Sequence, residues 1–224
     1  GRLSAIVLAA SAGDEFGSLT DHVPKAMLKV SGQPILARLA EDFESFGCRR
    51  LTIVRGYGAS GLEVAGARYV ENSEYAQTNE AYSLSLAVDA LHPGTLVSFG
   101  DLVLKRYIVH SLLEESDQGI TVVVDSKLVG PGQPDAVNTD RPYSGRFDLA
   151  SVHLQQIGSR VCADSSDGAW IGLLHVGDQG ATWLAEAVEE SRAAGVLRSE
   201  RIADLLTRVV GKGRAVRVVY IHGG

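Results

Sequence analysis

The stretch that decides the predicted fold spans residues 3–30 and reads LSAIVLAASAGDEFGSLTDHVPKAMLKV. Its first part, residues 3–9, is a short apolar run of the kind that a parallel sheet buries on both faces. The run stops at the small residues 10–13, which let a ligand approach the backbone closely. Amide groups exposed after a strand can form a concave anion site, and Lys25 can add a positive charge to it. The stretch therefore predicts a buried strand and a phosphate-binding turn, with an ordinary strand-to-loop turn as the alternative.

Length, charge and cysteine usage limit the class of protein. The 224 residues suit one α/β domain that covers residues 1–224. A net charge of -6 argues against nucleic-acid and anionic-membrane partners, because both need clustered basic residues. The cysteines, Cys48 and Cys162, lie far apart, so we expect neither a zinc site nor a disulfide framework, and a reducing cytoplasm as the compartment. Because Gly1 stands where an initiating Met is expected, we also expect the sequence to be a piece of a longer polypeptide.

Hydrophobic periodicity along the chain predicts alternating strands and helices, the order of an α/β domain. We expect strands at residues 3–9, 51–55, 67–70, 95–99, 120–124, 152–157, 170–176 and 215–221, and helices at 34–46, 78–91, 107–115, 183–194 and 202–210. The strands at 95–99 and 120–124 are followed by Asp101 and Asp125. In open α/β sheets the carboxyl ends of strands hold ligands, so these carboxylates are candidates for a site. The Pro-, Gly- and Asp-rich segment 129–150 is too long for a routine connection and is interpreted as a lid or acceptor-side excursion, with a surface loop as the alternative.

The opening stretch resembles the signature of the nucleotidyltransferase superfamily, in which LAAGxGxR is followed by PK. The matching residues are Leu8-Ala9-Ala10-Ser11-Ala12-Gly13-Asp14-Glu15 and then Pro24-Lys25-Ala26-Met27-Leu28. The resemblance implies a glycosyltransferase-A-like fold, a three-layer α/β/α sandwich with a mixed, mostly parallel sheet. It also implies that the backbone of Leu8, Ala9, Ala10, Ser11, Ala12 and Gly13 holds a nucleoside triphosphate and that Lys25 contacts the α-phosphate. Two positions depart from the signature: Ser11 replaces the first loop glycine, and Glu15 replaces the arginine that meets the leaving pyrophosphate.

A second match narrows the resemblance to cytidylyltransferases that act on phosphocholine and on phosphonates. It consists of Asn72-Ser73-Glu74-Tyr75, Thr78-Asn79 and Tyr82-Ser83-Leu84. Asn79 and Ser83 lie one turn apart on the expected helix, where an amide and a hydroxyl can face a base or a ribose. The alternative is that Thr78 or Asn79 caps the helix.

The segment Phe99-Gly100-Asp101 extends the resemblance, because the family places a metal-binding aspartate at this strand end. Magnesium binds a few carboxylate and phosphate oxygens together with water, so Asp101 can be its first protein ligand. In the family a second ligand comes from a WxD segment after the last strand, and the sequence ends at Gly224, where that segment is expected to begin.

The sequence is also similar to the cytidylyltransferase domain of the bifunctional phosphoenolpyruvate mutase/cytidylyltransferases of fosfomycin biosynthesis. This similarity implies transfer of CMP from CTP to 2-hydroxyethylphosphonate with release of pyrophosphate, and possible fusion to another catalytic domain. For the anionic acceptor, candidate side chains are Asp125, Lys127 and Arg141. Phosphocholine or a sugar 1-phosphate are alternative acceptors. From another class, Ser11 and Glu15 are also compatible with a non-catalytic nucleotide-binding or scaffold domain.

A competing motif is the formal GxGxxG at residues 56–61, which follows an expected strand. A dinucleotide-binding unit needs a crossover helix after the glycines, yet the next expected strand starts near residue 67. The spacing therefore argues against a nicotinamide cofactor.

Overall fold

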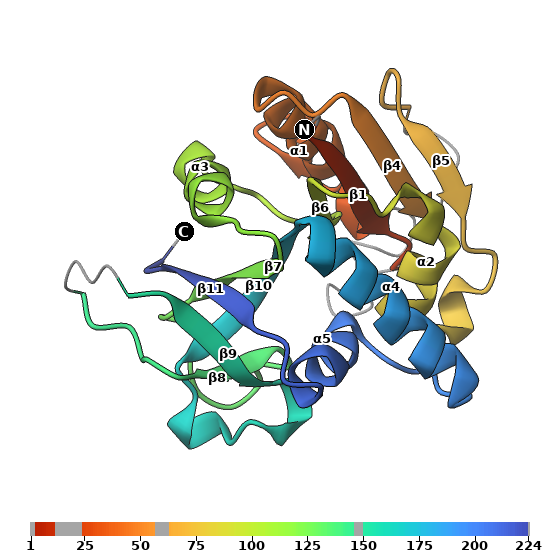
Figure 1. The fold of residues 1–224 in the computed structure, drawn as a ribbon. Helices are drawn as coiled ribbons and strands as arrows, with labels where there is room; N and C mark the ends of the chain where they lie inside the picture. Colours follow the sequence, from red (N-terminus) through yellow and green to blue (C-terminus); the bar gives the residue numbers. More distant parts are fainter. Residues whose placement is uncertain (1–2, 12–23, 57–62, 146–149, 224) are drawn as a thin grey trace.

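The computed structural model describes residues 3–11, 24–56, 63–145 and 150–223, which form a mixed nine-stranded sheet with helices on both faces (Figure 1). The strands are β1 Ser4–Ala9, β4 Arg50–Arg55, β5 Arg68–Glu71, β6 Thr95–Phe99, β7 Ile120–Asp125, β8 Ala136–Thr139, β9 Val152–Ile157, β10 Gly168–Val176 and β11 Val216–Ile221, with the small pair β2 Lys29–Val30 and β3 Gln33–Pro34 apart from them. The helices are α1 Ile35–Ser45, α2 Glu80–Leu86, α3 Arg106–Glu115, α4 Asp178–Ala193 and α5 Ile202–Gly211. Among these, no helix is long and apolar enough to cross a membrane.

The strand order in the large sheet is β5-β4-β1-β6-β10-β7-β11-β9-β8. Pairing is parallel from β5 to β6 and again between β7 and β11. β10 enters between β6 and β7 and is antiparallel to both, and β9 is antiparallel to β11 and β8. The predicted mixed sheet is confirmed, with antiparallel pairing concentrated in its second half.

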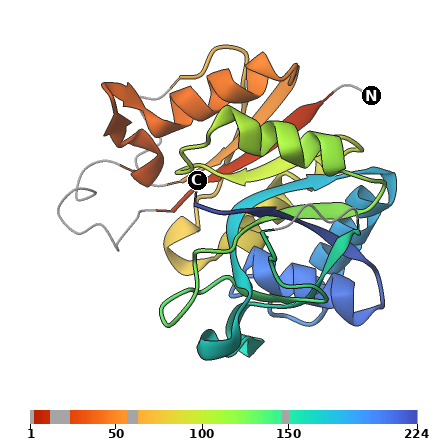
Figure 2. The same cartoon turned by 90° about the vertical axis from the view of Figure 1, so that its left-hand side faces the viewer.

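Alternation along the strands divides the core between the two faces of the sheet. Ile6 and Leu8 of β1 pack in the cluster that contains the buried residues of α2, α4 and α5. Ala5 and Val7 point the other way, into the cluster with α1 and α3. Figure 2 shows this division, with α1 and α3 on one side of the sheet and α4 and α5 on the other.

The structure corrects the expected elements at several places, the small strands β2 and β3 among them. A strand that the sequence did not predict, β8, lies inside the excursion 129–150 and pairs with β9 and β10. The helix expected at 78–91 ends at Leu86, and a separate 3-10 turn follows at Val88–Ala90, because the amide of Ala87 bonds three residues back to Leu84. α4 begins at Asp178, ahead of the expected position 183. Most of the GxGxxG segment, residues 57–61, lies outside the described residues.

Candidate active site

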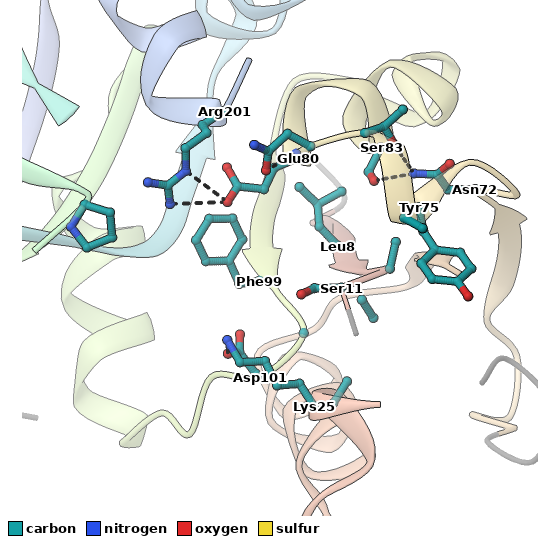
Figure 3. A pocket seen from close by; sticks show the side chains of 18 of the residues that line it. Leu8, Ser11, Lys25, Asn72, Tyr75, Glu80, Ser83, Phe99, Asp101 and Arg201 are labelled. Atoms are coloured by element: carbon teal, nitrogen blue, oxygen red, sulfur yellow. Dashed lines mark hydrogen bonds and ion pairs between the residues drawn. The ribbon is translucent and has the colours of Figure 1, made fainter. Parts of the chain in front are cut away.

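A cavity of about 670 Å³ opens at the carboxyl ends of β1 and β6 (Figure 3). This volume falls within the range of small-molecule sites. The two strands run parallel and adjacent, so the residues that follow them meet at one edge of the sheet. The described lining consists of Leu8, Ala9, Ala10, Ser11, Lys25, Ala26, Asn72, Tyr75, Ala76, Thr78, Asn79, Glu80, Ser83, Phe99, Gly100, Asp101, Pro134, Asp135 and Arg201.

Lys25 and Asp101, the two residues predicted to be catalytic, face each other in this cavity. Lys25 Nζ lies 2.9 Å from Asp101 Oδ2, and both side chains are partly shielded from solvent. Lys25 starts a single 3-10 turn, Lys25–Met27, whose Ala26 is buried against the core with α1 and α3. Asp101 lies two residues after the end of β6, next to Gly100. The arrangement can present the ammonium group to an anionic ligand and the carboxylate to a cation bound with that ligand.

The small residues after β1 and β6 allow the two strand ends to pack closely. Gly100 donates its N–H to the carbonyl of Leu8, and a Cβ at Gly100 would lie 2.7 Å from Cβ of Ala9. A larger residue at position 100 would therefore push the strand ends apart. Leu8, Ala9, Ala10 and Ser11 line the cavity as predicted for a nucleotide-binding loop. The predicted Ala12 and Gly13, and also Glu15, lie outside the described residues.

The side chain of Asn72 connects several residues of the cavity wall beside this loop through hydrogen bonds. Its side chain is 1% exposed, and its Nδ2 donates to Oγ of Ser83 and Oγ1 of Thr78, each at 3.0 Å. Its Oδ1 accepts from the amide of Glu74, so all polar atoms of the side chain have hydrogen-bond partners. Ser83 is thereby fixed in the cavity wall. The sequence match included both Asn72 and Ser83, but it gave a role in the site only to Ser83.

Asn79 lines the cavity and also caps a helix. Its Oδ1 accepts from the amide of Glu80, and its Nδ2 donates to the carbonyl of Ser199 at 3.4 Å. The capping alternative from the sequence is therefore the interaction that the structure contains. The bond to Ser199 also ties the start of α2 to the segment before α5.

An ion cluster of Glu80, Asp135 and Arg201 closes the cavity on the side of α5, and the sequence reasoning missed it. Arg201 Nη2 lies 3.3 Å from Glu80 Oε1 and 3.1 Å from Asp135 Oδ2, and Figure 3 shows Arg201 and Glu80 meeting beside Phe99. Oε2 of Glu80 accepts from the amide of Ile202 at the start of α5. Burial raises the pKa of Asp135 to about 6, against the lowering effect of Arg201, and the neighbouring Glu80 raises it further. The three residues come from distant parts of the chain, so no local motif could have indicated them.

The three residues proposed for the acceptor lie outside the lining of this cavity. Asp125 is buried at the end of β7, where its Oδ1 accepts from the amides of Lys127 and Gly223, both at 2.9 Å. This carboxylate therefore fixes the turn after β7 to the end of β11. The carbonyl of Arg141 accepts from the hydroxyls of Thr139 and Tyr220 on the neighbouring strands, the second at 3.4 Å.

The donor set fits a magnesium ion through one carboxylate. Among the described residues, no group of three or more His, Cys, Asp and Glu side chains could hold a metal by itself. Asp101 offers carboxylate oxygens in a cavity large enough for phosphate oxygens and water, the other ligands that magnesium prefers.

A parallel sheet edge with a small-residue turn, a lysine and an aspartate in one cavity is the arrangement expected of an enzyme that handles a nucleoside triphosphate. The family model for the MobA-like NTP transferase domain matches residues 5–212. The chain therefore belongs to this family, and the predicted membership of a nucleotidyltransferase family is confirmed.

Cytidylyltransferases are among the relatives that resemble the chain. The 2-aminoethylphosphonate cytidylyltransferase of Lancefieldella rimae is 32% identical over 109 residues, 46% of this chain and 44% of that protein. The choline-phosphate cytidylyltransferase of Haemophilus influenzae is 30% identical over 129 residues, 56% of this chain and 54% of that protein. The chain thus matches about half the length of these relatives. The CTP:phosphocholine cytidylyltransferase structure from Streptococcus pneumoniae aligns with 100% of this chain and 91% of its own at a TM-score of 0.72 and 21% identity, which shows a shared fold.

Proposed function

We propose that the protein transfers CMP from CTP to a small phosphonate or phosphate acceptor and releases pyrophosphate. The observation that carries this proposal is the single cavity in which Lys25 and Asp101 meet the backbone of residues 8–11 and the oriented hydroxyl of Ser83. The cytidylyltransferase relatives support CTP as the nucleotide.

In the proposed reaction an acceptor oxygen attacks the α-phosphorus in line, and pyrophosphate leaves on the opposite side without a protein nucleophile. The ammonium group of Lys25 neutralises charge that develops on the α-phosphate. The amides of residues 9–11 and the Ser83 hydroxyl hold the nucleotide. Asp101 would hold a magnesium ion, which would supply further charge neutralisation for the phosphates.

The resemblance to the fosfomycin-pathway enzymes implies 2-hydroxyethylphosphonate as one candidate acceptor, in a chain fused to another catalytic domain and working in the cytoplasm. A phosphonate acceptor agrees with the substrate named for the L. rimae relative, and phosphocholine agrees with the H. influenzae one. A sugar 1-phosphate remains the third candidate. The non-catalytic alternative predicts nucleotide binding without turnover.

A pyrophosphate-release screen tests the proposal. It crosses CTP, UTP, ATP and GTP with 2-hydroxyethylphosphonate, 2-aminoethylphosphonate, phosphocholine and glucose 1-phosphate in the presence of magnesium. We expect release to be fastest with CTP and a phosphonate. Equal rates with all four nucleotides would remove the cytidylyl assignment. CTP binding in calorimetry without turnover on any acceptor would instead favour the non-catalytic alternative.

A further inference from the structure

The cavity has two walls with different chemistry. The wall made by β1, α2 and the turn with Lys25 contains the backbone, hydroxyl and ammonium groups assigned above to the nucleotide. The opposite wall consists of Pro134 and Asp135, just before β8, and Arg201, just before α5. Glu80 at the start of α2 joins it through its ion pair with Arg201. Since the nucleotide takes the first wall, the second is left for the acceptor.

The acceptor wall carries an excess of negative charge. Of the described lining residues, Lys25 and Arg201 are the cations, and Lys25 is paired with Asp101. Arg201 is shared between Glu80 and Asp135, so at neutral pH two carboxylates face one guanidinium. A ligand group that bears one positive charge would balance this cluster.

Asp135 also has unused hydrogen-bonding capacity. The residue is 8% exposed, its Oδ2 contacts Arg201, and its Oδ1 has no hydrogen-bond partner among the described residues. A buried carboxylate oxygen without a donor is costly. Because a carboxylate rotates about its Cβ–Cγ bond, either oxygen can face Arg201 while the other accepts from a ligand. The cluster thus needs both a positive charge and a hydrogen-bond donor.

The backbone around Asp135 holds it at this position. Its carbonyl accepts from the amide of Trp170 in β10 at 2.9 Å, and β8 begins at the next residue. Phe99, which packs edge-on against the Trp170 ring with the centroids 5.2 Å apart, limits the space beside the cluster. These contacts fix the backbone position from which the Asp135 side chain reaches the cluster, and a specificity determinant requires such a fixed position.

We propose that Asp135, supported by Glu80, selects acceptors whose end remote from the phosphonate carries a primary ammonium group. This inference rests on the proposed function and names the acceptor class within it. A hydroxyl can donate one hydrogen bond to Asp135 but brings no charge. A quaternary ammonium brings charge but has no N–H to donate. A primary ammonium supplies both, and it is charged at neutral pH.

The test compares 2-aminoethylphosphonate with 2-hydroxyethylphosphonate, which differ only in the terminal group, as acceptors with CTP. For the unmodified protein we expect kcat/KM to be at least about tenfold higher for the amine. Asp135→Asn should reduce this ratio to near one, and Glu80→Gln should reduce it partly. Asp140→Asn, whose carboxylate contacts His153 and lies outside the described cavity lining, should leave the ratio unchanged.

Three outcomes separate the possibilities. Turnover by the unmodified protein with a kcat/KM for the amine no higher than that for the hydroxyl analogue would overturn the inference and leave the proposed function intact. An amine preference that survives in correctly folded Asp135→Asn and Glu80→Gln would also overturn it. Absence of pyrophosphate release with every acceptor would overturn the proposed function and the inference with it. Circular dichroism shows whether Asp135→Asn folds. If it does not, the inference is judged by the amine-to-hydroxyl ratio of kcat/KM in the unmodified protein and in Glu80→Gln.

Discussion

The ammonium group of Lys25 lies 2.9 Å from Oδ2 of Asp101, which joins the turn before α1 to the end of β6 inside one cavity. The pair holds each charge in place until an anionic ligand competes for the lysine. We expect Lys25→Ala and Asp101→Asn each to lower turnover by about two orders of magnitude or more, because the first removes the ammonium group that neutralises the α-phosphate and the second removes the carboxylate that would hold magnesium.

Pyrophosphate release under saturating CTP measures this effect, and thermal unfolding shows whether the fold is intact. Lys29→Ala is the matched control, since Lys29 is exposed and outside the described cavity lining. Turnover close to that of the unmodified protein in either cavity variant would remove these residues from the proposed mechanism.

Gly172 determines the position of Phe99, a residue of the cavity wall. It has φ +91, and a Cβ at this position would lie 2.3 Å from Cδ2 of the Phe99 ring. We expect Gly172→Ala to destabilise the protein by about 2 kcal/mol or more, through backbone strain and displacement of Phe99, and to raise the KM for the acceptor. Gly211→Ala, at the end of α5 with open space around it, should be neutral or stabilising. Chemical denaturation of both variants checks the difference, which a tolerated alanine at position 172 would contradict.

Asn72 organises the wall that contains Ser83. Replacing it with alanine leaves the hydroxyls of Thr78 and Ser83 and the amide of Glu74 without their partner. We expect a loss of about 2–3 kcal/mol in the free energy of unfolding and weaker CTP binding. Asn138→Ala, which removes a single bond to the carbonyl of Ser165, should cost less. Equal losses in the free energy of unfolding of the two variants would show that the three hydrogen bonds of Asn72 stabilise the fold no more than the single bond of Asn138.

His175 in β10 makes stability depend on pH. Burial lowers its pKa from 6.5, and its Nδ1 has no hydrogen-bond partner among the described residues. The pKa of His175 is lower in the folded protein than in the unfolded chain. The stability that comes from keeping the imidazole neutral is therefore present above pH 6.5 and is lost as the pH falls through the folded pKa. We expect His175→Gln to flatten this acid-side loss. Urea unfolding at a series of pH values measures it, and identical slopes in both proteins would refute the assignment.

Asp135 gives a pH dependence of the opposite sign. Its pKa is raised from 3.8 to about 6 by burial, with Glu80 and Asp204 raising it and Arg201 opposing them. The contribution of the protonated Asp135 carboxyl to the stability of the fold is therefore fully present below pH 3.8 and is lost as the pH rises through about 6. We expect Asp135→Asn to gain stability over the unmodified protein across this interval, by up to about 3 kcal/mol. The same urea unfolding measures the free energies of unfolding of the two proteins. A difference between them that stays constant from pH 4 to pH 7 would contradict this expectation.

Most strands and helices follow from local pattern, because apolar runs and helical spacing specify the elements that must bury a face. β8 did not, since its four residues, AVNT, sit among Pro, Gly and Asp and become a strand only by pairing with β9 and β10. Lys25, Asp101 and Ser83 were predicted from motifs and meet in one cavity. Asp125, Lys127 and Arg141 were selected by their place in the chain order, and the described cavity lining does not include them.

The sequence by itself determined the α/β class, the small-residue turn after β1, the position of Lys25 after Pro24, and the position of Asp101 after the β6 strand. Each of these depends on neighbours a few residues away along the chain. Only the tertiary structure decided that Glu80, Asp135 and Arg201 meet and that Asn72 orients Ser83. Such contacts arise when crossovers between distant strands bring their ends to one edge of the sheet, and that placement depends on the packing of the whole domain.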